Sequence, residues 1–132
     1  MPALARNRSV PNIVVSTADY ERLTDLATAS LERLPDVAEE LLNEMERAKV
    51  VGEDAVPDDV VRMGSKVTFR TDDGRQLTET LVYPTEEDSD AHKLSVMTPV
   101  GAALIGLAEG QSISWTARDG RKHKLTVEKV AR

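Results

Sequence analysis

The chain has 132 residues, 40% of them hydrophobic, which is enough for one moderate core but not for two full domains. A formal net charge of −6 and an aromatic content of 3% argue against nucleic-acid binding as the main activity, because an acidic chain repels phosphates and needs a local basic patch to bind them. The absence of cysteine excludes disulfides and thiolate catalysis, and no apolar run reaches the roughly 18 residues of a membrane span, so we expect a cytoplasmic protein.

The N-terminal part predicts a tail, a short extended segment and a helix. Residues 1–15 form a tail that ends in the extended run Ile13–Val15. Ser16 to Asp19 then match a capping box, in which a hydroxyl meets a free N–H and a carboxylate reaches back to the cap. Apolar residues follow at helical spacing, so a helix is expected to begin here.

A second helix is predicted from Pro35 to about Val50, because proline is disfavoured inside a helix but favoured in its first turn. A tight connection makes the two helices antiparallel. Helices of about 14 to 16 residues would extend roughly 21 to 24 Å, at ~1.5 Å per residue. Residues 16–51 are therefore predicted to form a short helical hairpin that resembles a coiled coil.

Strand periodicity begins after a joint at residues 52–57. Residues 66–70 and 76–83 alternate as strands around the turn Asp72–Gly74, although Glu79 is an exception on the apolar face of the second strand. Residues 85–93 are read as a solvated loop. Residues 52–132 are therefore expected to form a separate C-terminal domain.

The run Leu94–Trp115 combines a strand, a short helix and a second strand. Thr98 supplies a cap, Pro99 begins the helix, and Gly110 is predicted to end it. Asp119–Gly120 predicts a tight hairpin turn, and a break in alternation predicts a bulge or an end near Glu128. The chain as a whole is therefore expected to be an α+β protein.

Signals of enzymatic chemistry are weak. His92 and His123 lie in different segments without a ligand-spaced partner, so no metal site and no cofactor are predicted. No Walker or dinucleotide-binding glycine motif is present, which argues against a kinase.

The motif SVMTPVGAALIGLAEGQSISW resembles the C-terminal region of bacterial Gre transcript-cleavage factors. Together with PNIVVS, LPDVAEELLNEMERA, VPDDVVRMGSKVTFR and TLVYP, it makes nearly the whole chain similar to the Rnk family, the regulators of nucleoside diphosphate kinase, which are short relatives of Gre factors. The resemblance implies a helical hairpin followed by a domain like FK506-binding proteins (FKBP-like). It also implies a monomeric, non-enzymatic regulator that binds RNA polymerase at the rim of its secondary channel.

The resemblance also implies a docking loop. Its candidate residues are Met97, Thr98, Pro99, Val100 and Gly101. Capping the helix is expected to be the main local role of Thr98 and Pro99, with partner contact superimposed. Strand alternation predicts that Met97 points away from Val96, where an exposed apolar side chain would favour a partner surface.

Gre factors carry paired carboxylates at the tip of a long coiled coil, where they hold a magnesium ion for transcript cleavage. The corresponding tip here offers Glu32, Arg33 and Asp36. These residues are read mainly as solvated helix-end charges, and the short hairpin is expected to fall short of the active centre, so exclusion of Gre factors is favoured over cleavage. The alternatives left open are a peptidyl-prolyl isomerase and an interaction module for another protein.

Overall fold

A computed structural model describes residues 11–116 and 120–131 of the chain. The expected tail therefore lies outside the described residues up to residue 10, and so does Asp119 of the predicted turn. The helices and strands, in chain order, are β1 (Val14–Ser16), α2 (Thr17–Ala29), α3 (Pro35–Arg47), β2 (Lys49–Val51), η1 (Glu53–Ala55), β3 (Lys66–Thr71), β4 (Gln76–Val82), η2 (Pro84–Glu86), β5 (Lys93–Ser95), α4 (Pro99–Leu104), β6 (Ser112–Thr116) and β7 (Lys122–Ala131).

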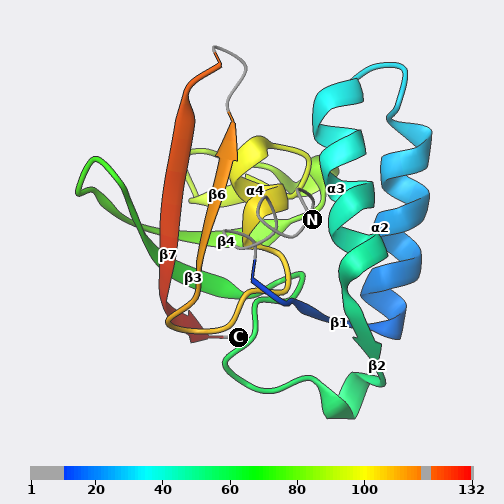
Figure 1. Ribbon diagram of the computed structural model, residues 1–132, viewed down its shortest axis with the longest axis horizontal. Helices are drawn as coiled ribbons and strands as arrows, with labels where there is room; N and C mark the ends of the chain where they lie inside the picture. The colour runs from blue at the N-terminus through cyan, green and yellow to red at the C-terminus, as the bar shows by residue number, and fades with distance from the viewer. Residues whose placement is uncertain (1–10, 117–119, 132) are drawn as a thin grey trace, which may run out of the picture.

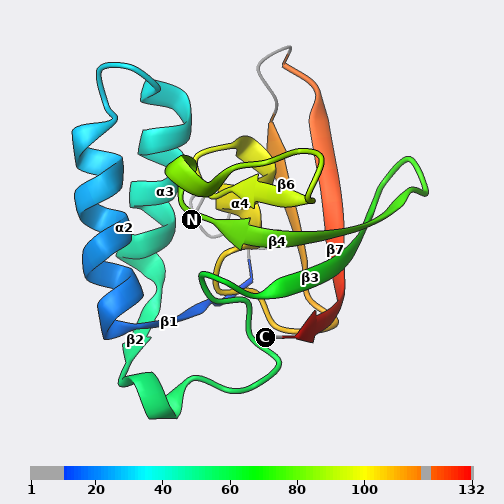
Figure 2. The same ribbon diagram turned by 180° about the vertical axis from the view of Figure 1, so that it is seen from behind.

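The strands form two sheets beside a helical hairpin. The larger sheet has the order β5-β4-β3-β7-β6 and is antiparallel except for the parallel pair β4–β5. The smaller sheet is the parallel pair β1–β2. The α2–α3 hairpin stands to one side, with α4 between α3 and the strands, and β7 lies on the far side (Figures 1 and 2). The α+β class predicted from the sequence is confirmed.

The hairpin begins with the predicted cap, although one of its details is wrong. The Ser16 hydroxyl accepts the N–H of Asp19 at 3.1 Å and caps α2. The Asp19 carboxylate, however, accepts the N–H of Met63 at 3.3 Å. A carboxylate expected to stay within the capping box thus joins the hairpin to the segment that precedes β3.

The second helix is shorter than predicted, because it ends at Arg47 rather than near Val50. Residues Lys49–Val51 form β2 instead, and the Lys49 N–H donates to the Ile13 carbonyl at 2.9 Å. The extended segment predicted at Ile13–Val15 provides this partner strand. Long-range strand pairing therefore replaces the last helical turn that the local pattern favours.

The helix after β5 also ends earlier than predicted. It stops at Leu104, and Gly106, with φ +82°, is the left-handed residue that follows its end; Gly110 is also left-handed, with φ +88°, but it lies in the turn before β6. The bulge predicted near Glu128 is confirmed, because the β3–β7 register shifts so that Glu128 has no partner on β3.

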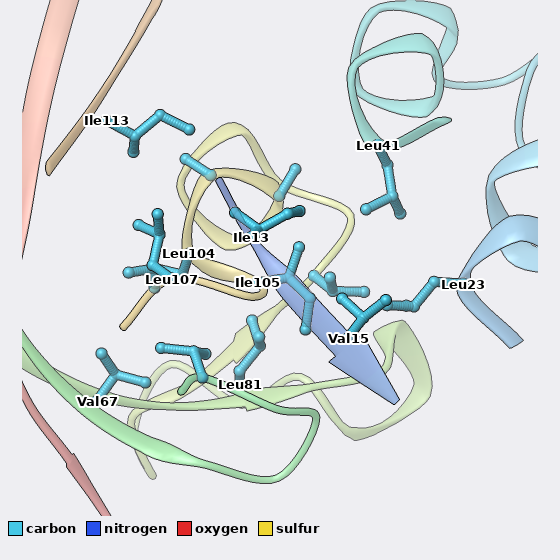
Figure 3. Close-up of a cluster of buried hydrophobic side chains, with 14 of the residues drawn as sticks. Ile13, Val15, Leu23, Leu41, Val67, Leu81, Leu104, Ile105, Leu107 and Ile113 are labelled. Atoms are coloured by element: carbon cyan, nitrogen blue, oxygen red, sulfur yellow. The ribbon is translucent and has the colours of Figure 1, made fainter. Parts of the chain in front are cut away.

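One hydrophobic cluster includes side chains from both the hairpin and the larger sheet. Strand β1 and the preceding Ile13 lie in the middle of this cluster (Figure 3). Ile13 and Val15 are placed between two groups of side chains: Leu23 and Leu41 of the hairpin, and those around Leu104. Gly106 permits this approach, because a Cβ there would come within 2.7 Å of the Ile13 Cβ. Within residues 11–116 and 120–131, no helix is long and apolar enough to cross a membrane.

Candidate functional site: the β5–α4 corner and the groove beside it

The corner between β5 and α4 is built by the side chain of Thr98. Its hydroxyl accepts the N–H of Gly101 at 3.0 Å and donates to the Ser95 carbonyl at 2.7 Å. Pro99 occupies the first turn of α4, where its missing N–H costs no helical hydrogen bond. The capping role predicted for these two residues is therefore confirmed, and it fixes the corner in one conformation.

Two of the five candidate docking residues, Met97 and Gly101, are buried. Met97 is only 6% exposed and belongs to the core, so the expectation of an exposed apolar side chain is wrong. The cause is a turn: the Ser95 hydroxyl accepts the Met97 N–H at 3.0 Å, which ends the alternation of β5. Gly101 is also buried, against the backbone of β5. The half-buried residues Thr98, Pro99 and Val100 are the part of the loop that remains accessible.

A groove of about 680 Å³ opens beside this corner, on the side of the sheet that carries Phe69 and Leu77. Apolar groups form much of its wall: Phe69, Leu77, Leu94, Pro99 and Val100. Charged and polar groups surround them: Thr71, Asp72, Asp73, Arg75, Glu79, Glu87, Ser89, His92, Lys93, Thr98 and His123. An apolar wall with a charged rim suits a protein segment that offers an apolar side chain with polar neighbours.

The structure brings together residues that sequence reasoning had kept apart. His92 Nδ1 lies 3.2 Å from a carboxylate oxygen of Glu79, and His123 lines the same groove. The Glu79 side chain is 18% exposed, whereas that of His92 is 72% exposed. Among the described residues, no group of three or more potential metal ligands is close enough to hold an ion. Glu79, His92 and His123 can therefore provide charge and hydrogen bonds to a ligand in the groove.

The positions of Glu79 and Phe69 in the groove were not predicted from the sequence. The signal for Glu79 was its place on the apolar face of its strand, where a carboxylate is expected to have a polar partner or a ligand. Phe69 gave no such signal, because a groove wall and a core use the same alternating pattern.

The turn that borders the groove is also ordered by polar contacts. The Thr71 hydroxyl donates to the Asp73 carboxylate, and Arg75 lies 3.3 Å from the same group. These contacts, with the Thr71 hydrogen bond first, lower the pKa of Asp73 below its usual range. This end of the groove therefore stays anionic around neutral pH.

The hairpin tip carries the other candidate residues. Helix α2 ends at Ala29 and α3 begins at Pro35, and Glu32, Arg33 and Asp36 are exposed at or next to the connection. Each helix has 13 residues, which corresponds to about 20 Å at ~1.5 Å per residue. The hairpin is thus slightly shorter than predicted.

A second group of acids lies along α3, away from the tip. Glu44 is buried and forms an ion pair with Arg47 at 2.5 Å. Burial, followed by repulsion from Glu44, raises the pKa of Glu40 to about 7. The charge of Glu40 is therefore expected to change around neutral pH.

The arrangement of a helical hairpin, an α+β domain and a capped corner corresponds to known families. Residues 56–132 match the family described as Transcription elongation factor, GreA/GreB, C-term, and residues 11–51 match the family described as Rnk N-terminus. The two matches together define a GreA/GreB-type domain that follows an Rnk-type hairpin.

Individual relatives agree with this class. The Regulator of nucleoside diphosphate kinase of Escherichia coli (strain K12) is 40% identical over 120 residues, which cover 90% of this chain and 88% of that protein. Transcription elongation factor GreA of Chloroflexus aurantiacus is 37% identical over 92 residues, which cover 69% of this chain and 58% of that protein. The solved structure of the GreA/GreB elongation factor from Nitrosomonas europaea aligns with a TM-score of 0.72 at 36% identity, covering 92% of this chain and 99% of that one. The chain therefore belongs to the GreA/GreB family and, within it, groups with the regulators of nucleoside diphosphate kinase, as its motifs predicted.

Proposed function

We propose that this chain is a non-enzymatic transcription regulator that binds RNA polymerase near its secondary channel. The observation that carries the proposal is the likeness of 90% of the chain to a regulator of nucleoside diphosphate kinase, combined with the GreA/GreB match over residues 56–132. The proposal places the protein in the bacterial cytoplasm and gives it no metal or cofactor.

The docking surface in this proposal is the groove together with the accessible part of the corner. Pro99 and Val100 combine fixed backbone geometry with half-buried apolar side chains. A rigid apolar surface binds with little loss of conformational entropy, which favours a protein partner. Met97 and Gly101 then act indirectly, because they hold this surface from below.

The hairpin tip is proposed to occupy the channel mouth without catalysing transcript cleavage. At about 20 Å, helices of this length form a short arm. Glu32 lies within the α2–α3 connection and Asp36 lies in the first turn of α3, with the cation Arg33 between them in the chain. A nearby cation weakens the binding of a divalent metal by carboxylates. A protein that keeps the docking domain but has a short arm is expected to compete with Gre factors.

The docking surface is tested by substituting an apolar side chain with a charged one. Val100→Glu places a carboxylate in the groove wall at a helix start, where an acidic residue is tolerated by the fold. We expect binding to core RNA polymerase to weaken at least tenfold, while the melting temperature changes little. Val50→Glu is the matched control, because Val50 is 41% exposed on β2, away from the groove, and this variant is expected to bind like the parent. Equal affinity of Val100→Glu and Val50→Glu would remove the groove from the interface.

Regulation of nucleoside diphosphate kinase is proposed to follow indirectly from the action on transcription. The name of the Escherichia coli relative states this regulation for that protein. In this chain, the expected result of deletion is a change in the transcript level of the kinase and no change in the activity of the purified kinase.

The groove also permits the isomerase alternative, together with the FKBP-like label for the domain. Its apolar wall is the favourable observation, but Phe69 is the only aromatic residue that lines it among the described residues. An isomerase needs an apolar pocket around a proline substrate, which one aromatic ring supplies poorly. In a proline-peptide isomerisation assay, we expect the uncatalysed rate.

A further inference from the structure

The face of the larger sheet that lies opposite the groove carries a concentration of positive charge. Directly paired residues of neighbouring strands lie on the same face. Phe69 of β3 pairs with Leu77 and Val127 on the apolar side, so Thr68, which pairs with Thr78 and Lys129, lies on the other side. This second side, the outer face, contains groups from four strands: Lys66, Thr68 and Arg70 of β3; Gln76, Thr78 and Thr80 of β4; Lys122, Lys124, Thr126 and Lys129 of β7; and Ser112 and Ser114 of β6.

The charge of this face is opposite to that of the chain. Strands β3 and β7 contribute five cations, Lys66, Arg70, Lys122, Lys124 and Lys129, and all five residues are exposed. The same two strands contribute one acid, Glu128, which binds Arg70 at 2.9 Å and Gln76 at 2.6 Å. Asp72, in the turn after β3, accepts the backbone N–H of Lys124 at 3.3 Å and is a second acid at the edge of this face. Five cations minus two acids leave +3 on this face, in a chain whose total is −6.

The four lysines are spread along the length of two neighbouring strands, with Lys66 on β3 and the other three on β7. Lys122 and Lys129 are seven residues apart on β7, which corresponds to about 23 Å at ~3.3 Å per residue. Among the described residues, no acidic side chain forms an ion pair with any of the four. Thr68 and Thr126 lie beside the lysines on β3 and β7, and each shares a hydrogen bond with a hydroxyl of the flanking strand, Thr78 of β4 at 3.0 Å and Ser112 of β6 at 2.7 Å. Ammonium groups along two strands with hydroxyl groups beside them are suited to a series of phosphate groups.

We propose that the outer face binds the phosphate backbone of single-stranded nucleic acid without reading its bases. No aromatic side chain is placed on this face by the register of the described strands, so stacking cannot select bases. One phosphate contact per lysine gives about four contacts for a bound strand. The site is separate from the proposed polymerase surface, because the two lie on opposite sides of the sheet, and both can be occupied at once. The basic patch that an acidic chain needs for nucleic-acid binding is therefore present at one place.

The proposal is tested by fluorescence anisotropy with a labelled 12-nucleotide oligo(U) RNA and the full chain. Nonspecific binding of this kind has a Kd of about 10⁻⁴ to 10⁻⁶ M. With about four phosphate contacts, the slope of log K against log salt is expected to be about −2.8 for a single strand. An oligo(dT) strand of the same length is expected to bind within about threefold, since no base or 2′-hydroxyl readout is proposed.

Paired lysine variants make the test specific to this face. Lys124→Gln with Lys129→Gln is expected to weaken binding at least tenfold and to reduce the size of the salt slope by about 1.4. Arg33→Gln with Lys49→Gln removes the same charge from exposed residues elsewhere and is expected to bind like the parent. Equal loss in both double variants would overturn the proposal, because only net charge would then matter. A poly-glutamate peptide that competes as well as the RNA at equal charge would also overturn it, in favour of an acidic protein partner.

Discussion

Gly101 provides a direct test of how the docking corner is held. A Cβ built at this position overlaps the Ser95 carbonyl oxygen and lies 2.9 Å from both the Ser95 carbonyl carbon and Val96 Cα. All three atoms belong to the backbone of β5 or its extension, so no side-chain rotation relieves the overlap. Gly101→Ala must therefore push α4 away from β5, and overpacking of this kind costs about 3 kcal/mol or more. For a chain of this length, that loss lowers the melting temperature by about 10 °C.

The measurement is thermal and urea unfolding followed by circular dichroism. Gly52→Ala is the matched control, because a Cβ at Gly52 meets nothing within 4 Å and its φ of −65° suits alanine. We expect this control to unfold within about 2 °C of the parent, since the corresponding free-energy change is a few tenths of a kcal/mol. A Gly101→Ala variant as stable as Gly52→Ala would show that contact with β5 does not fix the corner.

Three further predictions concern the hairpin and its charges. Ser16→Ala removes the cap of α2 and should lower the free energy of unfolding by about 1 kcal/mol, measured in urea, whereas an unchanged midpoint would contradict the capping role. Leu41→Ala should cost about 2 to 5 kcal/mol in the same assay, because the side chain is fully buried between the helices and β1, and a smaller loss would mean that the hairpin packs loosely. Burial, followed by repulsion from Glu44, raises the pKa of Glu40 from 4.5 to about 7, so the folded state is expected to lose stability as pH rises from about 4.5 to about 7, by about 1 to 2 kcal/mol because solvent screens this partly exposed group. Glu40→Gln should therefore gain stability relative to the parent over this range and keep the gain above pH 7, whereas a difference between this variant and the parent that does not vary with pH would contradict it.

Local signals predicted most of the elements, because each element begins with strong chemistry of its own. The Ser16 cap, the proline starts of α3 and α4, and the turn before β4 depend on neighbours within a few residues. The bulge at Glu128 was also predictable, because a single extra residue shifts the apolar alternation of the strand.

The errors occurred where distant segments decide the structure. Residues 49–51 continue a helical pattern, yet they form β2 because β1 offers backbone partners from 35 residues away in the chain. Two glycines were available to end α4, and the choice of Gly106 depends on the packing of Ile13 against it. Met97 is buried because a turn at Ser95 interrupts β5, and strand alternation cannot predict such a turn.

The candidate site was predicted in part. The corner residues were found through their motif, but the groove beside them is formed by β3, β4 and the loop before β5, which are separate in the chain. The basic outer face was not predicted, since it depends on the pairing of β3 with β7 across more than 50 residues.

The proposed function requires this chain and Gre factors to bind the same region of RNA polymerase. The most direct measurement adds the purified chain to backtracked elongation complexes that contain a limiting amount of GreA, and follows transcript cleavage. We expect that cleavage falls as the chain is added, that excess GreA restores it, and that the Val100→Glu variant inhibits far less than Val50→Glu. Undiminished cleavage at saturating concentrations of the chain, or inhibition that excess GreA does not reverse, would show that the two proteins do not compete for this region.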